Sequence, residues 1–229
     1  MSSSIKISEQ LILNIKLNAC FEIEIELLKN IKFEKLLSDL ITDNHKKTFW
    51  INVYNAFFQI LANQEKSKDV LDKKIFQVKK IEIAEKLFSL NDIEHGILRK
   101  SKFVFGFGYL QNPFYSKFIS QLQVEKLDYR IHFALNCGAN SCPPISFYEF
   151  NSINLQLNLA TKSFLFSETK IDFDNKRIKT SRLLFWYFKD FGTNWQIIKI
   201  IENVFSYNLS GFSISFLDYD WTINLKNFK

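Results

Sequence analysis

The chain has few of the residues that mark turns, cross-links and fibrous folds. It holds 6 Gly, 3 Pro and 3 Cys among 229 residues, which excludes collagen-like and Gly- or Pro-rich classes. An odd number of Cys argues against a disulfide framework and indicates a reducing compartment. No apolar run approaches the roughly 20 residues that span a bilayer, and the N-terminal apolar stretch is broken by Lys16, Glu22 and Glu24, unlike a secretory signal. We therefore expect a cytoplasmic protein without membrane insertion.

The sequence also lacks a strong charge signal. Its net charge is +6, with 30 basic and 24 acidic residues. The lysines are scattered, arginine is scarce, and no zinc-finger, Walker or RNA-binding pattern appears. We therefore expect no nucleic acid partner, and an unknown small molecule or peptide instead. With 47% hydrophobic and 24% charged residues, the chain has the composition of a globular protein.

Helical and strand periodicities alternate along the chain without regular βαβ units, which indicates an α+β fold. We expect a helix-rich single domain over residues 1–229, with a helical part at 1–63 and a mixed part at 64–229, packed on a small, mainly antiparallel sheet. The expected helices are 8–19, 33–41, 48–63, 154–166, 182–188 and 195–204. The expected strands are 75–78, 129–137, 170–173, 177–180, 212–217 and 221–225.

The helix expected at 48–63 is apolar nearly all round but carries a stripe of amides. Asn52, Asn55, Gln59 and Asn63 follow at i, i+3, i+7 and i+11. A buried amide without a partner costs about 1–3 kcal/mol. The stripe therefore pairs internally and holds loops, or it lines a wet cleft; internal pairing is favoured.

A further helix is expected after Ser89. Ser89 and Asp92 have the spacing of a weak capping box. The helix then places His95 and Arg99 four residues apart on one face.

The segment from Arg130 to Pro144, RIHFALNCGANSCPP, combines a histidine with two cysteines. If it begins as a strand, Arg130, His132 and Asn136 share one face and Cys137 lies on the other. At ~3.3 Å per residue, His132 and Cys137 are also about 16 Å apart. Cys142 follows a turn that could fold back over the strand.

These residues allow three kinds of site. The first uses a thiol nucleophile, with Cys142 preferred over Cys137, His132 or His95 as base, and Asn136 or an Asp as orienting group. The second is a metal site on the same His and Cys residues, which lacks the second ligand pair of zinc knuckles and is weaker. The third is ordinary core packing. We expect neither a metal nor a cofactor.

Five stretches in this order carry a family resemblance: FWINVYNAF at 49–57, SLNDIEHGILR at 89–99, DYRIHFALNCGANSCPPI at 128–145, FWYFKDFG at 185–192 and YDWTIN at 219–224. Through them the chain resembles the family named domain of unknown function 547. The resemblance implies that the motif residues matter without implying an activity. The motif residues are Asn52, Tyr54, Asn55, His95, His132, Asn136, Cys137, Cys142, Trp186, Asp190, Asp220 and Trp221.

A fainter, fold-level similarity is to papain-like and transglutaminase-like thiol hydrolases. In those a Cys heads the helix, whereas here the helix begins with Thr48. The leading hypothesis is a thiol-dependent hydrolase or transferase acting on amide or thioester bonds. The alternative is a non-catalytic binding or scaffold domain, and a metal site ranks third. The residues expected to support the site or bind the ligand are His95, Arg130, Asn52, Asn55, Asp190 and Asp220.

Overall fold

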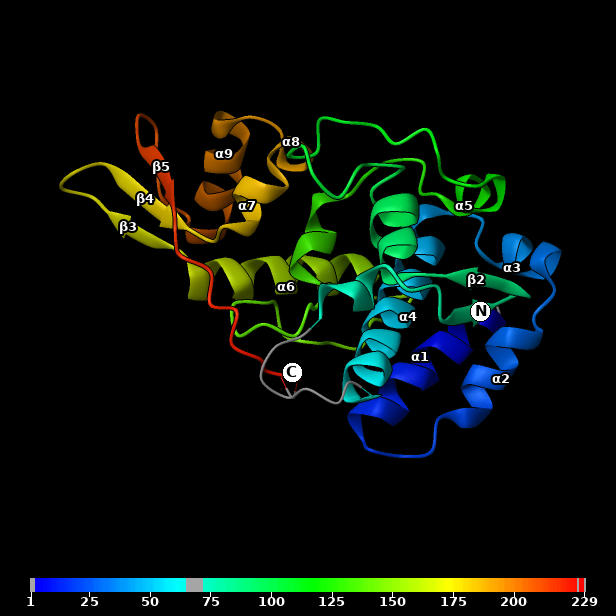
Figure 1. Cartoon of the computed structure of the whole chain (residues 1–229). Helices are drawn as coiled ribbons and strands as arrows, with labels where there is room; N and C mark the ends of the chain where they lie inside the picture. The colour runs from blue at the N-terminus through cyan, green and yellow to red at the C-terminus, as the bar shows by residue number, and fades with distance from the viewer. Residues whose placement is uncertain (1–2, 65–71, 226, 229) are drawn as a thin grey trace.

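The computed structural model describes residues 3–64, 72–225 and 227–228, and most of this chain is helical (Figure 1). The α-helices are α1 (Ser3–Lys16), α2 (Glu22–Asn30), α3 (Phe33–Asp39), α4 (Asp43–Gln64), α5 (Lys117–Leu122), α6 (Ile153–Glu168), α7 (Leu183–Trp186), α8 (Phe188–Phe191) and α9 (Asn194–Phe205). The shorter helical segments are the 3₁₀ helices η1 (Lys73–Phe76) and η3 (Tyr129–Phe133) and the π-helix η2 (Asp92–Leu98). The strands are β1 (Ile81–Ile83), β2 (Lys86–Phe88), β3 (Lys170–Asp172), β4 (Arg177–Thr180) and β5 (Ser213–Phe216). The helix-rich α+β prediction is confirmed.

Helix α4 runs through the larger hydrophobic core, because it is apolar on nearly every side. Its residues Phe49, Trp50 and Phe58 are fully buried. Helix α1 packs against α4 and adds Ile5 and Leu11 to the same core (Figure 1). None of the helices that the structure describes is long and apolar enough to cross a membrane.

A second core lies between α6, α9 and the three-stranded sheet. It contains Leu165 of α6, Ile178 of β4 and Ile197 of α9, all fully buried. Phe133 of η3 belongs to this core, and its ring centroid lies 5.3 Å from that of Phe164. The motif segment that contains η3 is therefore placed against the C-terminal elements.

The strands form two small sheets rather than one. Strands β1 and β2 are antiparallel and joined by Ala84 and Glu85, whose positive φ angles of 52° and 60° suit a two-residue type I′ turn. The second sheet has the order β3-β4-β5, with an antiparallel first pair and a parallel second pair. Two of the three pairings are antiparallel, as expected.

Three strand predictions are wrong. Residues 129–133 form η3, which Asp128 caps by accepting the backbone N–H of Arg130. Residues 73–76 form η1, likewise capped by an aspartate, and 221–225 make only one isolated bridge, between Ala139 and Ile223. A short apolar run fits a strand or a buried helical turn equally well, and these local caps decide between them. Residues 65–71 of the lysine-rich connector lie outside the described residues.

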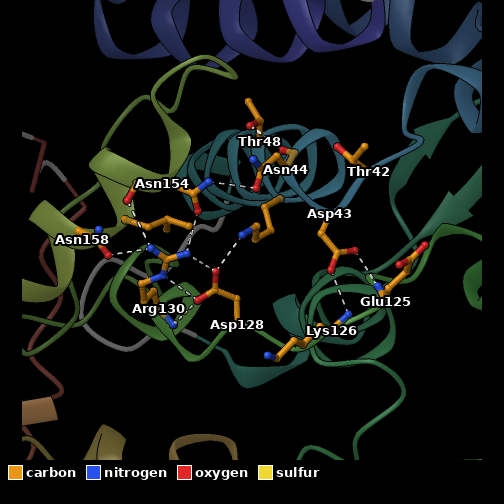
Figure 2. Close-up of polar contacts among 12 residues, drawn as sticks. Thr42, Asp43, Asn44, Thr48, Glu125, Lys126, Asp128, Arg130, Asn154 and Asn158 are labelled. Atoms are coloured by element: carbon orange, nitrogen blue, oxygen red, sulfur yellow. Dashed lines mark hydrogen bonds and ion pairs between the residues drawn. The ribbon is translucent and has the colours of Figure 1, made fainter. Parts of the chain in front are cut away.

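The longer periodic elements agree with prediction. The helices expected at 48–63, 154–166 and 195–204 are α4, α6 and α9, and the expected hairpin is β3-β4. Helix α4 starts earlier than expected, at Asp43. The Asp43 carboxylate accepts the backbone N–H groups of Glu125 and Lys126, at 2.6 and 3.0 Å (Figure 2).

Candidate functional site

The amide stripe on α4 fastens two loops to the core. Asn52 donates to the carbonyl of Tyr148 at 2.7 Å and accepts the N–H of the same residue at 3.0 Å. Asn55 donates to the carbonyl of Ala134 at 2.9 Å and accepts the N–H of Asn136 at 3.0 Å. Both asparagines are fully buried. The preference for internal pairing over a wet cleft is confirmed for Asn52 and Asn55. Among the described residues Gln59 Nε2 has no partner, and Asn63 is exposed.

Asn136 extends this fastening into the turn that follows it. Its Nδ2 donates to the carbonyl of Pro143 at 2.7 Å, and its Oδ1 accepts the N–H of Gly138 at 2.8 Å. Gly138 has a φ of +79°, and a Cβ there would lie 2.6 Å from a ring carbon of Phe58. Only glycine fits this position, so the turn is shaped by the core beneath it.

The two cysteines of the motif are joined in a disulfide, Cys137–Cys142. In this state neither sulfur is a thiolate, so the predicted nucleophiles Cys142 and Cys137 exist only after reduction. The backbone N–H of Cys137 lies 3.0 Å from the sulfur of Cys142, and the Tyr219 hydroxyl lies 3.3 and 3.1 Å from the sulfurs of Cys137 and Cys142. No hydrogen bond joins a sulfur to an imidazole in the part of the chain that the structure describes.

The disulfide also corrects the expectation drawn from cysteine number. The odd count arises because Cys20, far from the motif in sequence, is free and exposed. Disulfides are typical of oxidising compartments, so this feature does not support the predicted reducing one.

The C-terminal motif, residues 219–224, forms hydrogen bonds with the turn between Cys137 and Cys142. Asp220 accepts the N–H of Ser141 through its carbonyl, at 3.2 Å, and its own N–H bonds to the Ser141 hydroxyl at 2.9 Å. The Asp220 carboxylate accepts from Asn140 and from the N–H of Thr222, both at 2.9 Å. Asp220, one of the residues expected to support the site or bind the ligand, therefore fixes two turns.

Arg130, His132 and Asn136 do not share a face, because the strand that would have aligned them is a 3₁₀ helix. Arg130 turns to Asp128, with Nε 2.8 Å from its Oδ1, and to Asn154 and Asn158 on α6 (Figure 2). His132 points elsewhere and is 3% exposed.

His132 meets a buried ion pair. Its Nε2 lies 2.9 Å from Oδ2 of Asp190, and the same oxygen accepts from Nε of Arg99 at 2.6 Å. The side chains of all three residues are only 1% exposed. One ring face of His132 stacks on Tyr187, with centroids 3.9 Å apart. Asp190, one of the residues expected to support the site or bind the ligand, pairs with the guanidinium of Arg99.

The π-helix η2 completes this cluster. Its start shows the predicted capping interaction, since Ser89 and Asp92 exchange hydrogen bonds at 2.9 and 3.1 Å. Nη1 of Arg99 donates to Nδ1 of His95 at 2.8 Å, as the predicted one-face spacing requires. Next to His95, Glu94 accepts hydroxyl hydrogen bonds from Tyr54 at 3.1 Å and from Tyr187 at 2.8 Å. The buried cluster is defined by Glu94, His95, Arg99, His132, Tyr187 and Asp190.

Both histidines of the buried cluster are neutral near pH 7. Burial lowers the pKa of His95 to about 4, and it also lowers the pKa of His132 despite the hydrogen bond to Asp190. Burial would raise the pKa of Asp190, but the hydrogen bonds from His132 and Arg99 outweigh it and lower that pKa. The proton of His132 is therefore on Nε2, donated to Asp190, and Nδ1 of His95 accepts from Arg99.

A surface loop, residues 103–110, covers the buried cluster and is called the covering loop. Arg99 donates to the carbonyl of Phe103 at 3.2 Å, and the N–H of Lys189 donates to the carbonyl of Phe107 at 2.9 Å. A Cβ on Gly108, whose φ is +81°, would lie 2.5 Å from Oδ1 of Asp190. That oxygen is buried and has no hydrogen-bond partner among the described residues. The loop thus closes over Asp190 at a position that only glycine can occupy.

Sequence reasoning missed several of these residues as site components. Glu94, Arg99, Tyr187 and Tyr219 were not among the expected site residues, although the spacing of His95 and Arg99 was a usable signal. Tyr187 lies three residues before Asp190, but nothing local connects Glu94 or Arg99 to Asp190, or Tyr219 to the disulfide. A hollow of about 370 Å³ is lined by Asp190 of the buried cluster together with Tyr129, Lys189, Gln196 and Lys199.

The metal hypothesis finds no support in the described residues. Within 3–64, 72–225 and 227–228, no group of three or more His, Cys, Asp or Glu side chains is arranged to hold a metal ion. The two sulfurs bond to each other, and His95 and His132 are each committed to partners in the buried cluster.

Comparison with known proteins gives one result. A family model described as protein of unknown function, DUF547, matches residues 38–165, which is more than half of the chain. The matched range contains the amide stripe, the disulfide and both clustered histidines, and it ends before Asp190 and Tyr219. No curated protein and no solved structure matches the chain, so the similarity to papain-like and transglutaminase-like hydrolases gains no support. The chain belongs to the DUF547 family.

Proposed function

We propose that this protein is a non-catalytic binding domain, in which the motif residues form a buried framework that holds a surface loop in a fixed shape. The observation that carries the proposal is the double role of Arg99 and Asp190. They pair with each other inside the protein and also contact the covering loop at Phe103 and Gly108. A framework of this kind links loop shape to core stability.

The accessibility of the motif residues supports this proposal. A general base must reach the proton that it removes. His132 instead has Nε2 directed at Asp190, one ring face against Tyr187, and an exposed fraction of 3%. Asn52 and Asn55 use their side-chain oxygen and nitrogen on backbone groups of neighbouring loops. These contacts are those of a framework rather than of groups that await a substrate.

Hydrogen exchange of the loop tests the proposal. We expect Asp190→Asn and His132→Ala to lower the melting temperature and to speed amide exchange across residues 103–110. The matched control is Asp218→Asn, because Asp218 also pairs with an arginine, Arg182, but its side chain is 98% exposed. The proposal is overturned if His132→Ala leaves both the melting temperature and the exchange of the loop unchanged.

A thiol-dependent hydrolase or transferase is the second candidate. The observation that favours it is the Tyr219 hydroxyl, which lies within hydrogen-bond distance of both sulfurs and would donate to a thiolate released by reduction. The His132–Asp190 pair has the form of a base and its orienting group. In this candidate Cys142 is the nucleophile and Cys137 is the second choice.

Alkylation after reduction tests the second candidate. The reduced protein is treated with iodoacetamide at several pH values, and labelling of Cys137 and Cys142 is compared with that of Cys20, an exposed thiol whose pKa is raised by its hydrogen bond to Glu22. Fast labelling of Cys142 at neutral pH supports a thiolate site. Labelling of both motif cysteines no faster than a free thiol removes this candidate.

A further inference from the structure

The covering loop and its flanks carry basic and aromatic residues without any acidic ones. Between His95 and Val124 there is no Asp or Glu, while the basic residues are Arg99, Lys100, Lys102 and Lys117. The same stretch contains seven aromatic side chains besides His95: Phe103, Phe105, Phe107, Tyr109, Phe114, Tyr115 and Phe118. We call residues 103–114 the aromatic loop.

Most apolar side chains of the aromatic loop are exposed, whereas Phe103 is half-buried. Phe114 is 85% exposed, Phe105 66%, Tyr109 57% and Val104 55%. Single exposed apolar residues are ordinary, but a contiguous group marks an interaction surface. Phe107 extends the group to helix α7, since its ring centroid lies 4.9 Å from that of the exposed Phe185.

Hydrogen bonds and backbone conformation fix the shape of the aromatic loop. Backbone hydrogen bonds join Phe103 N–H to the Leu110 carbonyl at 3.1 Å and Tyr109 N–H to the Gly106 carbonyl at 2.9 Å. Its tip passes through three consecutive left-handed positions, Gly106, Phe107 and Gly108. Together with the anchors to Arg99 and Lys189, these bonds present the aromatic rings without a large ordering cost on binding.

Every charged side chain between His95 and Val124 is basic. Lys100 and Lys117 are exposed, and the ammonium of Lys189, also exposed, lies 5.6 Å above the ring of Tyr109. The acidic residue beneath the loop, Asp190, is buried and already paired with Arg99. Any partner therefore meets exposed aromatic rings with ammonium groups beside them.

We propose that the aromatic loop docks on an anionic lipid bilayer, with its rings in the headgroup region and the lysines on the lipid phosphates. Aromatic side chains favour the membrane interface, and basic residues near an anionic surface add attraction that salt weakens. This requires no spanning helix. The proposal rests on the proposed binding function and names its partner.

Vesicle co-sedimentation of the full chain tests this docking. The probes are vesicles of phosphatidylcholine alone and of phosphatidylcholine mixed with phosphatidylserine. We expect sedimentation with the mixed vesicles, little with phosphatidylcholine alone, and release as salt is raised. The double variant Phe105→Ser/Phe114→Ser should lose about tenfold or more in partitioning, because two interfacial rings are removed. Both residues are exposed, so the fold does not depend on them.

The control is Phe173→Ser, which removes an aromatic ring that is 52% exposed between β3 and β4. It should bind vesicles like the unchanged protein. Equal sedimentation with both vesicle types, equal binding by the double variant, or binding only to a protein partner overturns the membrane proposal. The exchange experiment on Asp190→Asn uses no lipid. An absence of vesicle binding therefore contradicts membrane docking but not the framework function. An absence of faster exchange in the loop contradicts the framework function but does not test docking.

Discussion

Oδ2 of Asp190 accepts a hydrogen bond from Nε of Arg99 at 2.6 Å, although 91 positions separate the two residues in the sequence. Both side chains are 1% exposed, so this pair is shielded from water and from salt. A buried pair adds little when compared with apolar residues, but the loss of one partner leaves the other charge uncompensated.

Asp190→Asn should therefore cost about 3–5 kcal/mol of unfolding free energy. In a protein of this size the melting temperature should fall by roughly 10 °C. Asp218→Asn, at the exposed pair with Arg182, should cost less than about 1 kcal/mol. Urea unfolding of the two variants measures both values. Equal losses would show that burial of the Arg99 pair has no energetic role.

The neutral buried histidines predict a loss of stability in mild acid. Below pH about 6.5 an unfolded imidazole takes up a proton, whereas the pKa of His95 in the folded protein is about 4. The unfolded state therefore binds more protons as the pH falls from 6.5 to 4, and stability falls with it, by roughly 3 kcal/mol for His95.

Urea unfolding at steps between pH 7.5 and 4 measures this slope. His95→Gln should flatten it, since glutamine does not titrate. His45→Gln should keep most of it, because His45 lies outside the buried cluster and is partly exposed. A flat profile in the unchanged protein would contradict the neutral assignment.

Asp128 predicts a separate acid transition at lower pH. Burial would raise the pKa of Asp128, but hydrogen bonds from Arg130 and Lys47 outweigh it and bring that pKa to about 2. The resulting stability is present above pH about 4 and is lost as the pH falls toward 2, about 2 kcal/mol in all. Asp128→Asn should remove this loss, measured by acid unfolding, while Asp174→Asn at an exposed turn should leave it unchanged.

The amide stripe predicts unequal costs along one helix. Asn55→Ala leaves the carbonyl of Ala134 and the N–H of Asn136 without their partner, at about 1–3 kcal/mol for each group. Gln59→Met should change stability by less than about 1 kcal/mol, because the Nε2 of Gln59 is buried without a partner among the described residues. Thermal unfolding of the two variants distinguishes them. Similar losses would mean that the stripe acts through packing rather than through hydrogen bonds.

The features that sequence predicted well are local ones. The spacing of Asn52 and Asn55, the Ser89–Asp92 cap and the contact of His95 with Arg99 all follow from helical periodicity. They need no knowledge of the rest of the chain, and the structure contains each of them.

The features that sequence missed depend on distant or ambiguous information. Residues 129–137 are too short and too apolar for periodicity to separate a strand from a helical turn. The partners of His132 and of the disulfide, Asp190 and Tyr219, lie 58 positions or more away, and nothing in the sequence near them indicates these pairings. The pairing of Cys137 with Cys142 depends on oxidation, which residue counts do not reveal.

Tyr219 also brings the disulfide close to two tryptophans, whose fluorescence can report whether the disulfide is formed. Its ring lies 4.8 Å from that of Trp186 and 4.5 Å from that of Trp221, while its hydroxyl contacts both sulfurs. Two of the four tryptophans therefore lie one side chain away from a group that quenches indole fluorescence when oxidised. The emission of the protein should record, without any added label, whether Cys137 and Cys142 are joined.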